Sequence, residues 1–247
     1  MHRFFIPNEW FQADEVVFQE PVAHQIRRVL RMRTGEHLIV LAQAGSQYEI
    51  ELTQLDPVVK GRILQEQPTV GEPAFHLTLY QCLVQREKFE WILQKCTEIG
   101  VSEFVPVISS RSLPRRGGAE DSQKILRWQR ILQEAAEQSQ RGRIPLLCPP
   151  LPFEQALKDA ISRHSQVFIP WEYETQGKLQ ETLVNLPGDT PPRLAYLIGP
   201  EGGFSDGEVQ LARQAGAMPI SLGKRILRVE TAAIVAAALF MHVQGDI

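Results

Sequence analysis

One strand-loop-helix unit decides the fold class of this chain: residues 193–209, which read RLAYLIGPEGGFSDGEV. The run from Arg193 to Ile198 is apolar and rich in strand-forming residues, which predicts a buried strand. Residues 199–203 then hold three glycines and a proline, and Ser205 with Glu208 forms the capping-box pattern that starts a helix. A strand that passes through a tight loop into a helix is the repeating unit of a parallel α/β sheet.

The same alternation extends outward from this unit. Strands are predicted over residues 76–84, 103–108, 166–169 and 218–222, and helices over residues 87–99, 121–139, 153–164, 178–186, 205–215 and 230–243. The first of these helices carries apolar residues at helical spacing and is expected to stop at Gly100. Residues 74–247 are therefore predicted to form an α/β domain, with a mostly parallel sheet and helices on both faces.

The first 70 residues have a different pattern. A short amphipathic helix is predicted over residues 21–33, and strands are predicted over residues 37–41, 47–52 and 58–64, with Gly45 at a turn. Residues 66–73 are polar and contain Pro and Gly, which favours a boundary there. Short strands at close spacing predict a small β-rich barrel as a separate domain over residues 1–70.

Composition excludes several classes of protein. The chain has 247 residues, 43% of them hydrophobic and 22% charged, with a net charge of -3, so it is neither disordered nor a polycation. Its three cysteines, Cys82, Cys96 and Cys148, are far apart, which argues against a disulfide framework or a zinc site and fits a cytoplasmic protein. The N-terminus shows no signal-peptide pattern, and the apolar run over residues 232–243 is shorter than the roughly 20 residues that span a bilayer. We therefore expect no metal and no membrane association.

Three loops follow predicted strands and are candidate ligand sites, because parallel sheets bind ligands beyond the carboxyl ends of their strands. They are residues 170–172 (PWE), 199–204 (GPEGGF) and 223–231 (GKRILRVET). The second loop could be a tight turn alone, but the helix cap needs only Ser205 and Glu208 and leaves the glycines unexplained. It lacks the lysine of a phosphate-binding loop, which disfavours a nucleotide hydrolase.

The third loop sets Ile226 and Leu227 between Arg225 and Arg228. This pattern fits an apolar ligand wall beside a charged one, or equally core residues beside solvated arginines. Glu230 at the start of the next helix could be a simple first-turn acid.

Basic residues gather in the middle of the chain. Residues 86–143 hold 11 Lys and Arg against 8 Asp and Glu, although the whole chain is acidic. Arginine forks match phosphate oxygens, so this region could bind nucleic acid, or it could be a solvated helix face. Trp91 and Trp128 could stack on bases, but tryptophan at helical spacing is more often core.

With these residues in view, the chain resembles the RsmE family of ribosomal RNA methyltransferases in the SPOUT superfamily. The resemblance spans nearly the whole sequence in order. Its motifs are MHRFF at residues 1–5, HxxxRVLR at 24–31, QKCTEIGV at 94–101, RW through EAxEQSxR at 127–141, IGPEGGF at 198–204 and LGxRILRxETA at 222–232. The loop at residues 115–118 does not align clearly.

This resemblance implies transfer of a methyl group from S-adenosylmethionine to N3 of a uridine in 16S ribosomal RNA, within the small ribosomal subunit. It also implies a PUA-like N-terminal barrel that holds RNA, a C-terminal trefoil knot and a homodimer. The cofactor-binding residues it implies are Glu172, Ile198, Gly199, Glu201, Gly202, Gly203, Leu222, Gly223, Ile226, Leu227 and Arg228. Arg3, Arg28, Arg31, Arg111 and Arg141 are the implied RNA contacts.

Methylation of uridine N3 needs an exposed Watson–Crick edge and loss of the N3 proton. We expect Arg228 to stabilise negative charge on the uracil oxygens, and Glu230 either to orient Arg228 or to take the proton. Two alternatives remain open. One is a non-catalytic RNA-binding or ribosome-assembly factor, which would need no cofactor loops, and the other is a SPOUT methyltransferase acting on transfer RNA.

Overall fold

A computed structural model describes residues 1–42, 45–112, 119–175 and 192–247 of the chain. The helix expected over residues 178–186 lies outside these ranges. The chain divides into two compact units, one formed by Met1–Glu72 with Ala136–Ile144, and the other by Pro73–Ala135 with Pro145–Ile247. The segment 136–144 thus belongs with the N-terminal residues, which no local sequence pattern indicated.

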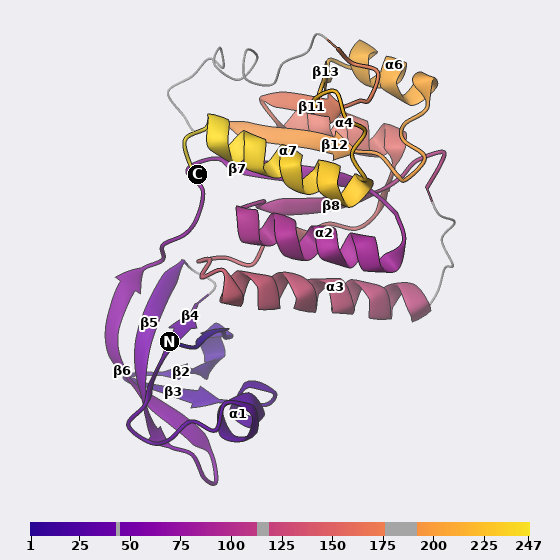
Figure 1. Ribbon diagram of the computed structural model, residues 1–247. Helices are drawn as coiled ribbons and strands as arrows, with labels where there is room; N and C mark the ends of the chain where they lie inside the picture. The colour runs from indigo at the N-terminus through magenta and orange to yellow at the C-terminus, as the bar shows by residue number, and fades with distance from the viewer. Residues whose placement is uncertain (43–44, 113–118, 176–191) are drawn as a thin grey trace. The chain divides into compact units, whose positions relative to one another are not determined.

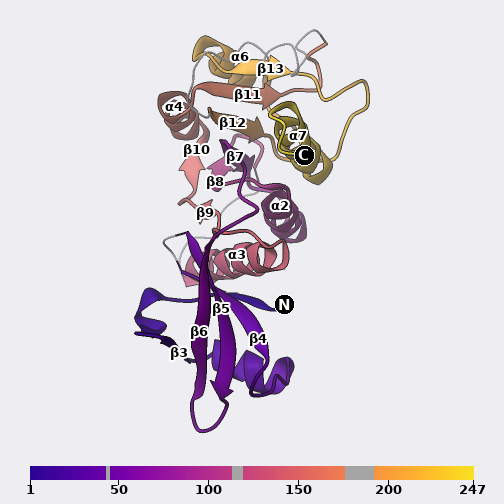
Figure 2. The same cartoon turned by 90° about the vertical axis from the view of Figure 1, so that its left-hand side faces the viewer.

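The N-terminal unit contains a six-stranded sheet in the order β1-β4-β5-β6-β3-β2 (Figure 2). Strand β1 is parallel to β4, and the other neighbours are antiparallel. The strands are β1 (Arg3–Phe5), β2 (Phe11–Gln12), β3 (Glu15–Phe18), β4 (His37–Leu41), β5 (Ser46–Gln54) and β6 (Val59–Pro68). The three strands predicted here are confirmed, but β6 continues through residues 66–68, which the sequence had placed in a linker.

The helix predicted over residues 21–33 is shorter in the structure. It consists of α1 (Val22–His24) and the π-helical turn η2 (Gln25–Val29). The chain reverses at Arg31, whose φ is 52°, and this turn places Met32 in the apolar core of the unit with Ile26. The apolar spacing correctly indicated that Ile26 and Met32 are buried. The two residues do not share one helix, however, because Ile26 lies in the π-helical turn and Met32 follows the turn at Arg31.

The C-terminal unit is built on a parallel sheet of seven strands in the order β10-β8-β7-β12-β11-β13, with β9 paired to β8 (Figure 1). Among the described residues, all the strand pairs of this sheet are parallel, as predicted. The strands are β7 (His76–Cys82), β8 (Glu103–Ile108), β9 (Leu146–Leu147), β10 (Leu151–Pro152), β11 (Gln166–Pro170), β12 (Arg193–Ile198) and β13 (Met218–Ile220). The two-residue strands β9 and β10 were not predicted, because they are too short to show a period.

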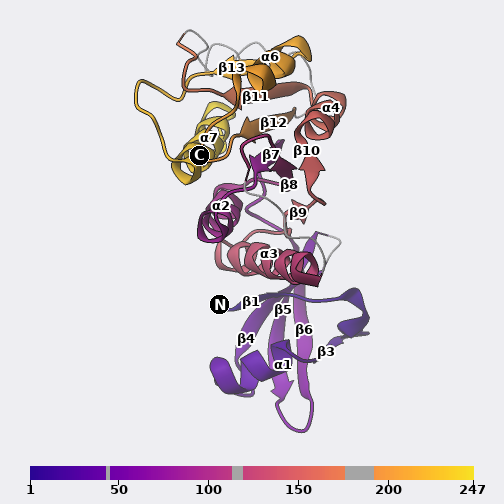
Figure 3. The same ribbon diagram turned by 90° about the vertical axis from the view of Figure 1, so that its right-hand side faces the viewer.

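Helices cover both faces of this sheet, which confirms the predicted layers (Figure 3). They are α2 (Arg86–Ile99), α3 (Ala119–Gln138), α4 (Phe153–Arg163), α6 (Asp206–Gln214) and α7 (Val229–Val243). One buried cluster joins the sheet to α2, α3 and α7, and the other joins its opposite face to α4 and α6. Successive strand residues alternate between the clusters, as Tyr196 and Leu197 do on β12.

Local sequence signals explain where several helices begin and end. Helix α2 stops at Gly100, whose φ of 124° suits glycine and whose N–H donates to the carbonyls of Cys96 and Thr97. Helix α6 begins with the predicted capping box, in which the Ser205 side chain accepts from the Glu208 N–H and the Glu208 carboxylate accepts from the Ser205 N–H. The cap fixes the direction in which the chain leaves the glycine-rich loop.

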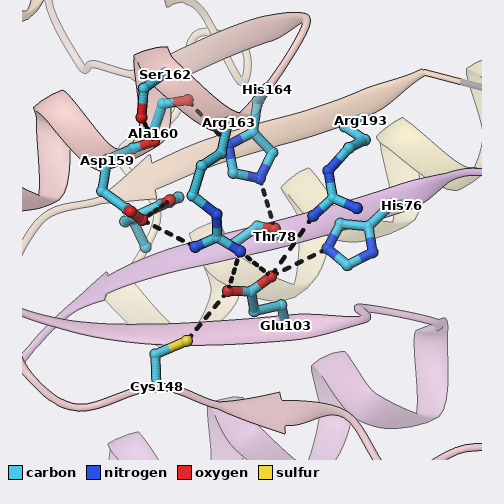
Figure 4. A network of polar contacts seen from close by, with 11 residues as sticks. His76, Thr78, Glu103, Cys148, Asp159, Ala160, Ser162, Arg163, His164 and Arg193 are labelled. Atoms are coloured by element: carbon cyan, nitrogen blue, oxygen red, sulfur yellow. Dashed lines mark hydrogen bonds and ion pairs between the residues drawn. The ribbon is translucent and has the colours of Figure 1, made fainter.

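The amino-terminal edge of the parallel sheet holds a buried carboxylate. Glu103 is 1% exposed, and both of its carboxylate oxygens accept hydrogen bonds from Nη2 of Arg163 at 2.7 Å (Figure 4). Nε2 of His76 lies 3.2 Å from Oε2 of Glu103. Burial by itself raises the pKa of Glu103, but the hydrogen bonds of His76, Arg163 and Cys148 outweigh it and lower the pKa to about 2. This network ties the starts of β7 and β8 to the end of α4.

None of the helices in the described part of the chain is long and apolar enough to cross a membrane.

Candidate functional site

A cavity of about 450 Å³ lies at the carboxyl ends of β11, β12 and β13. This volume falls in the range of small-molecule sites, about 300–1,000 Å³. All three strand-end loops contribute to its wall, together with the start of α7. The predicted cofactor and catalytic residues all line it, namely Glu172, Ile198, Gly199, Glu201, Gly202, Gly203, Leu222, Gly223, Ile226, Leu227, Arg228 and Glu230.

The glycine-rich loop after β12 is held in a tight turn by the Gly203 N–H, which donates to the Pro200 carbonyl at 2.9 Å. Gly203 has a φ of 66°, and a Cβ atom there would lie 2.8 Å from Oε1 of Glu172. A Cβ at Gly199 would lie 3.1 Å from the Phe204 nitrogen. Gly203 is therefore required by its backbone conformation and Gly199 by the close approach of Phe204, beyond what the helix cap demands.

Glu201 anchors the outer side of this loop to the start of α2. Its Oε1 accepts from the Gln85 N–H at 3.2 Å and from Nζ of Lys88 at 3.1 Å. Burial favours a higher pKa for Glu201, but hydrogen bonds from backbone N–H groups and Lys88 outweigh it and lower the pKa. The carboxylate is thus held ionised at the cavity wall.

The other side of the loop is fastened to the segment that follows β8. Nη1 of Arg111 donates to the Gly202 carbonyl at 2.8 Å, and the Ser110 N–H donates to Glu208 at 2.9 Å. Burial raises the pKa of Glu208, and the N–H groups of Ser110 and Ser205 more than offset this, so that its pKa is lowered. Arg111, predicted to contact RNA, therefore supports the glycine-rich loop.

The loop before α7 presents charge and apolar surface together. Ile226 is 88% exposed, and its neighbours Arg225 and Arg228 are also exposed. Arg228 is the N-cap residue of α7, and Glu230 lies in the first turn. One oxygen of Glu230, Oε2, is buried and has no hydrogen-bond partner. An unpartnered buried carboxylate oxygen in a cavity wall is suited to accept a hydrogen bond from a ligand.

The structure adds lining residues that the sequence did not indicate as site residues. Lys88 comes from α2, more than a hundred positions before the glycine-rich loop, so no local signal could have found it. Trp171 follows β11 directly, and its place next to the predicted site residue Glu172 is the sequence feature that could have identified it as a lining residue. Its indole Nε1 is buried without a partner, and Arg213 packs over the ring at 5.3 Å.

The remaining predicted RNA contacts lie in the N-terminal unit. Arg28 and Arg31 are exposed. Arg3 is partly buried, its side chain donates to Gln47, and burial lowers its pKa. Arg141 corrects a prediction: its side chain is 3% exposed and donates to both oxygens of Glu72, at 3.1 and 2.8 Å. A guanidinium buried against a carboxylate is not presented to a phosphate, and loss of Arg141 would take this charged partner from Glu72.

Within the described residues, no group of three or more His, Cys, Asp or Glu side chains could hold a metal ion. The loop arginines at residues 115 and 116 lie outside the described ranges.

The comparisons with known proteins agree with this geometry. A family model described as an RNA methyltransferase domain matches residues 71–241, which include the entire cavity wall. A ribosomal RNA small subunit methyltransferase E from Synechocystis is 34% identical over 245 residues, covering 96% of this chain and 76% of that protein. The chain belongs to the ribosomal RNA small subunit methyltransferase E family. The family resemblance seen in the motifs is thereby confirmed.

Other members of the methyltransferase E family show the same extent of similarity. The protein from Bacillus subtilis is 30% identical, with 96% of this chain and 94% of that protein covered. The structure of the Neisseria gonorrhoeae enzyme bound to S-adenosylmethionine matches with a TM-score of 0.86 at 29% identity, covering 98% of both chains. The structure of a Legionella pneumophila protein solved with bound S-adenosylmethionine also matches, with a TM-score of 0.86 at 28% identity, covering 97% of this chain and 96% of that one.

Proposed function

We propose that this enzyme transfers the methyl group of S-adenosylmethionine to N3 of a uridine in 16S ribosomal RNA. The observation that carries the proposal is the single cavity in which the glycine-rich loop, the basic loop and the end of β11 meet. Family membership supplies the reaction class, and the solved relatives supply the cofactor. A non-catalytic assembly factor would have no reason to keep this cavity and its loops.

The residues present fit the cofactor. Ile198, Leu222 and Leu227 offer apolar walls for an adenine ring, and the backbone of the glycine-rich loop can approach its edges. Glu172 and Glu201 can accept hydrogen bonds from ribose hydroxyls or from the ammonium group. The unpartnered Glu230 Oε2 and Trp171 Nε1 are an acceptor and a donor that a bound molecule would satisfy.

The cofactor, when bound, supplies a methyl group already activated by its positive sulfur, so the protein has mainly to position and desolvate the reactants. The uridine must be unpaired to expose N3, and N3 must lose its proton to attack. Arg228 lines the cavity wall, and its proposed role is to stabilise the negative charge that develops on the uracil oxygens.

Glu230 is the proposed acceptor of the N3 proton. Within the described residues, the buried Oε2 of Glu230 has no hydrogen-bond partner. This geometry favours proton acceptance over orientation of Arg228.

We further propose the finer features of the fold that the family resemblance implies. The loops after β11, β12 and β13 meet at one cavity, which is the arrangement expected if the C-terminal segment is knotted. The six-stranded sheet of residues 1–72 is proposed to act as a PUA-like domain that holds RNA, with Arg28 and Arg31 among its exposed cations. The enzyme is proposed to be a cytoplasmic homodimer that acts on the small ribosomal subunit.

Two measurements test the function. Calorimetric titration should show saturable binding of S-adenosylmethionine and none of adenosine triphosphate. Incubation with small subunits that lack the modification should then yield 3-methyluridine in the digested 16S RNA, detected by mass spectrometry. Cofactor binding with methylated transfer RNA as the product would instead support the transfer RNA alternative. Absence of both cofactor binding and product would support the assembly-factor alternative.

A further inference from the structure

Trp91 is an exposed aromatic residue on a helix whose other face forms core. Its side chain is 50% exposed, whereas Trp128, the other tryptophan in this region, is 2% exposed. Helix α2 buries Phe89, Ile92 and Leu93 in the cluster beneath it, so the core face of the helix excludes Trp91. The structure thus separates two tryptophans that sequence spacing could not distinguish.

Trp91 lies next to the wall of the cofactor cavity. Residues three and four apart are neighbours on a helix surface, so Lys88, Trp91 and Lys95 form one row, which we call the α2 stripe. Lys88 lines the cavity and donates to Glu201, and Nζ of Lys95 lies 5.0 Å from the centre of the Trp91 ring. The stripe therefore begins at a side chain that lines the cavity and continues along the surface of α2.

We propose that Trp91 stacks on an unpaired nucleotide that neighbours the methylated uridine in ribosomal RNA, an inference that rests on the proposed function. A uridine presented at N3 has to leave its base stack, and the nucleotides beside it lose stacking partners at the same time. An indole ring within one helical turn of the cavity replaces such a partner, and it does so whatever the identity of the base.

The charges of the α2 stripe indicate that its contribution to RNA affinity comes from base stacking and not from the release of counterions. Both ammonium groups have a carboxylate partner, since Lys88 pairs with Glu201 at 3.1 Å and Lys95 pairs with Glu98 at 2.7 Å. The stripe is thus close to neutral, and its contribution to RNA binding should depend little on salt.

The test compares Trp91→Ala and Trp91→Phe with the native enzyme. The matched control is Leu146→Ala, because Leu146 is 58% exposed but pairs with Glu103 at the opposite edge of the sheet. We would measure kcat and KM for unmodified small subunits at saturating cofactor, and the cofactor Kd by calorimetry. Binding of a fluorescein-labelled single-stranded oligoribonucleotide would be measured by anisotropy at two salt concentrations.

Trp91→Ala is expected to raise KM for the subunit and the Kd for the oligoribonucleotide on the order of tenfold, with the same ratio at both salt concentrations. Trp91→Phe should recover most of the loss, and Leu146→Ala should show none. The cofactor Kd and kcat should stay within about twofold of native.

Several results would overturn the inference. Unchanged RNA binding in Trp91→Ala would do so while leaving the methyltransferase function intact. A change in sedimentation coefficient in Trp91→Ala would show that the residue contacts a second copy of the chain instead. If the native enzyme bound cofactor but methylated no small subunit, the proposed function would fail first, and the oligoribonucleotide arm would still decide whether Trp91 contacts RNA.

Discussion

Arg111 donates a hydrogen bond to the carbonyl oxygen of Gly202 at 2.8 Å, across 91 positions of sequence. The same nitrogen lies 3.5 Å from the Phe204 carbonyl. An arginine that charge alone would assign to RNA thus supports the backbone of the loop that lines the proposed cofactor cavity. Support of the loop predicts an effect of Arg111 on the cofactor Kd, whereas contact with RNA predicts an effect on KM for the small subunit.

Arg111→Ala is expected to weaken S-adenosylmethionine binding several-fold, because a hydrogen bond from a charged donor contributes about 1.5–3 kcal/mol and exposure of this one reduces its value. The measurement is cofactor Kd by calorimetry beside KM for the small subunit. An unchanged cofactor Kd with a raised KM for the subunit would contradict the supporting role and restore the RNA contact.

Gly203→Ala should damage both the loop and the cavity. Its Cβ would lie 2.8 Å from Glu172 Oε1, at a φ of 66° that disfavours alanine. We expect a loss of about 1–2 kcal/mol in the free energy of unfolding from the left-handed conformation, together with a raised cofactor Kd. Urea denaturation and calorimetry measure these two quantities.

Gly207→Ala is the matched control for that change. Gly207 lies on α6, and a Cβ atom there meets nothing within 4 Å. Alanine is the better helix former, so this variant should be as stable as native or more stable, by up to about 1 kcal/mol. Equal destabilisation of both variants would refute the requirement for glycine at position 203.

Arg228→Ala should lower kcat on the order of 100- to 1,000-fold if Arg228 stabilises charge on the uracil oxygens, with a much smaller effect on cofactor Kd. Arg225→Ala is the comparison, since Arg225 is an exposed arginine in the same loop. It should lose less activity. Native turnover in Arg228→Ala with normal cofactor binding would rule out the proposed role.

Glu230→Gln keeps the size of the side chain and removes its charge. As the proton acceptor, Glu230 should contribute about 100- to 10,000-fold to kcat, so the variant should be nearly inactive in single-turnover assays. The double variant with Arg228→Ala distinguishes the two mechanisms. If the losses in activation free energy from the two single variants add in the double variant, the residues have separate roles. If the kcat of the double variant is no lower than that of Arg228→Ala, Glu230 only orients Arg228.

Glu103 should make stability depend on acid pH. Its pKa is lowered to about 2 in the folded protein, from an ordinary value of about 4.3 when unfolded. The carboxylate therefore stabilises the fold above about pH 4.5, and this contribution is lost as the pH falls towards 2. Glu103→Gln should lower the free energy of unfolding at pH 7 by about 1–2 kcal/mol, because it removes the charge from the buried hydrogen bonds to Arg163, which is 34% exposed and keeps its pair with Asp159.

The check is urea denaturation of both proteins between pH 7 and pH 3. The native protein should lose stability more steeply than Glu103→Gln on the acid side. Parallel curves would show that other carboxylates dominate the acid response.

The local conformations of the glycine-rich unit could be predicted from sequence. The strand at residues 193–198, the capping box of Ser205 and Glu208, and the stop of α2 at Gly100 all appear as expected. Each depends on residues close together in the chain, whose steric and hydrogen-bonding preferences act locally. The family motifs also identified the residues of the cavity wall, although periodicity alone left each loop with two interpretations.

The positions of residues relative to distant partners were decided only by the tertiary structure. Sequence spacing treated Trp91 and Trp128 alike, and charge treated Arg111 and Arg141 alike, yet one tryptophan is exposed and one buried, and Arg141 pairs with Glu72. Lys88 reaches the glycine-rich loop because β7, which precedes α2, lies beside β12 in the sheet. Such contacts depend on strand order, which short-range preferences do not encode, so burial and pairing emerge only when the sheet is assembled.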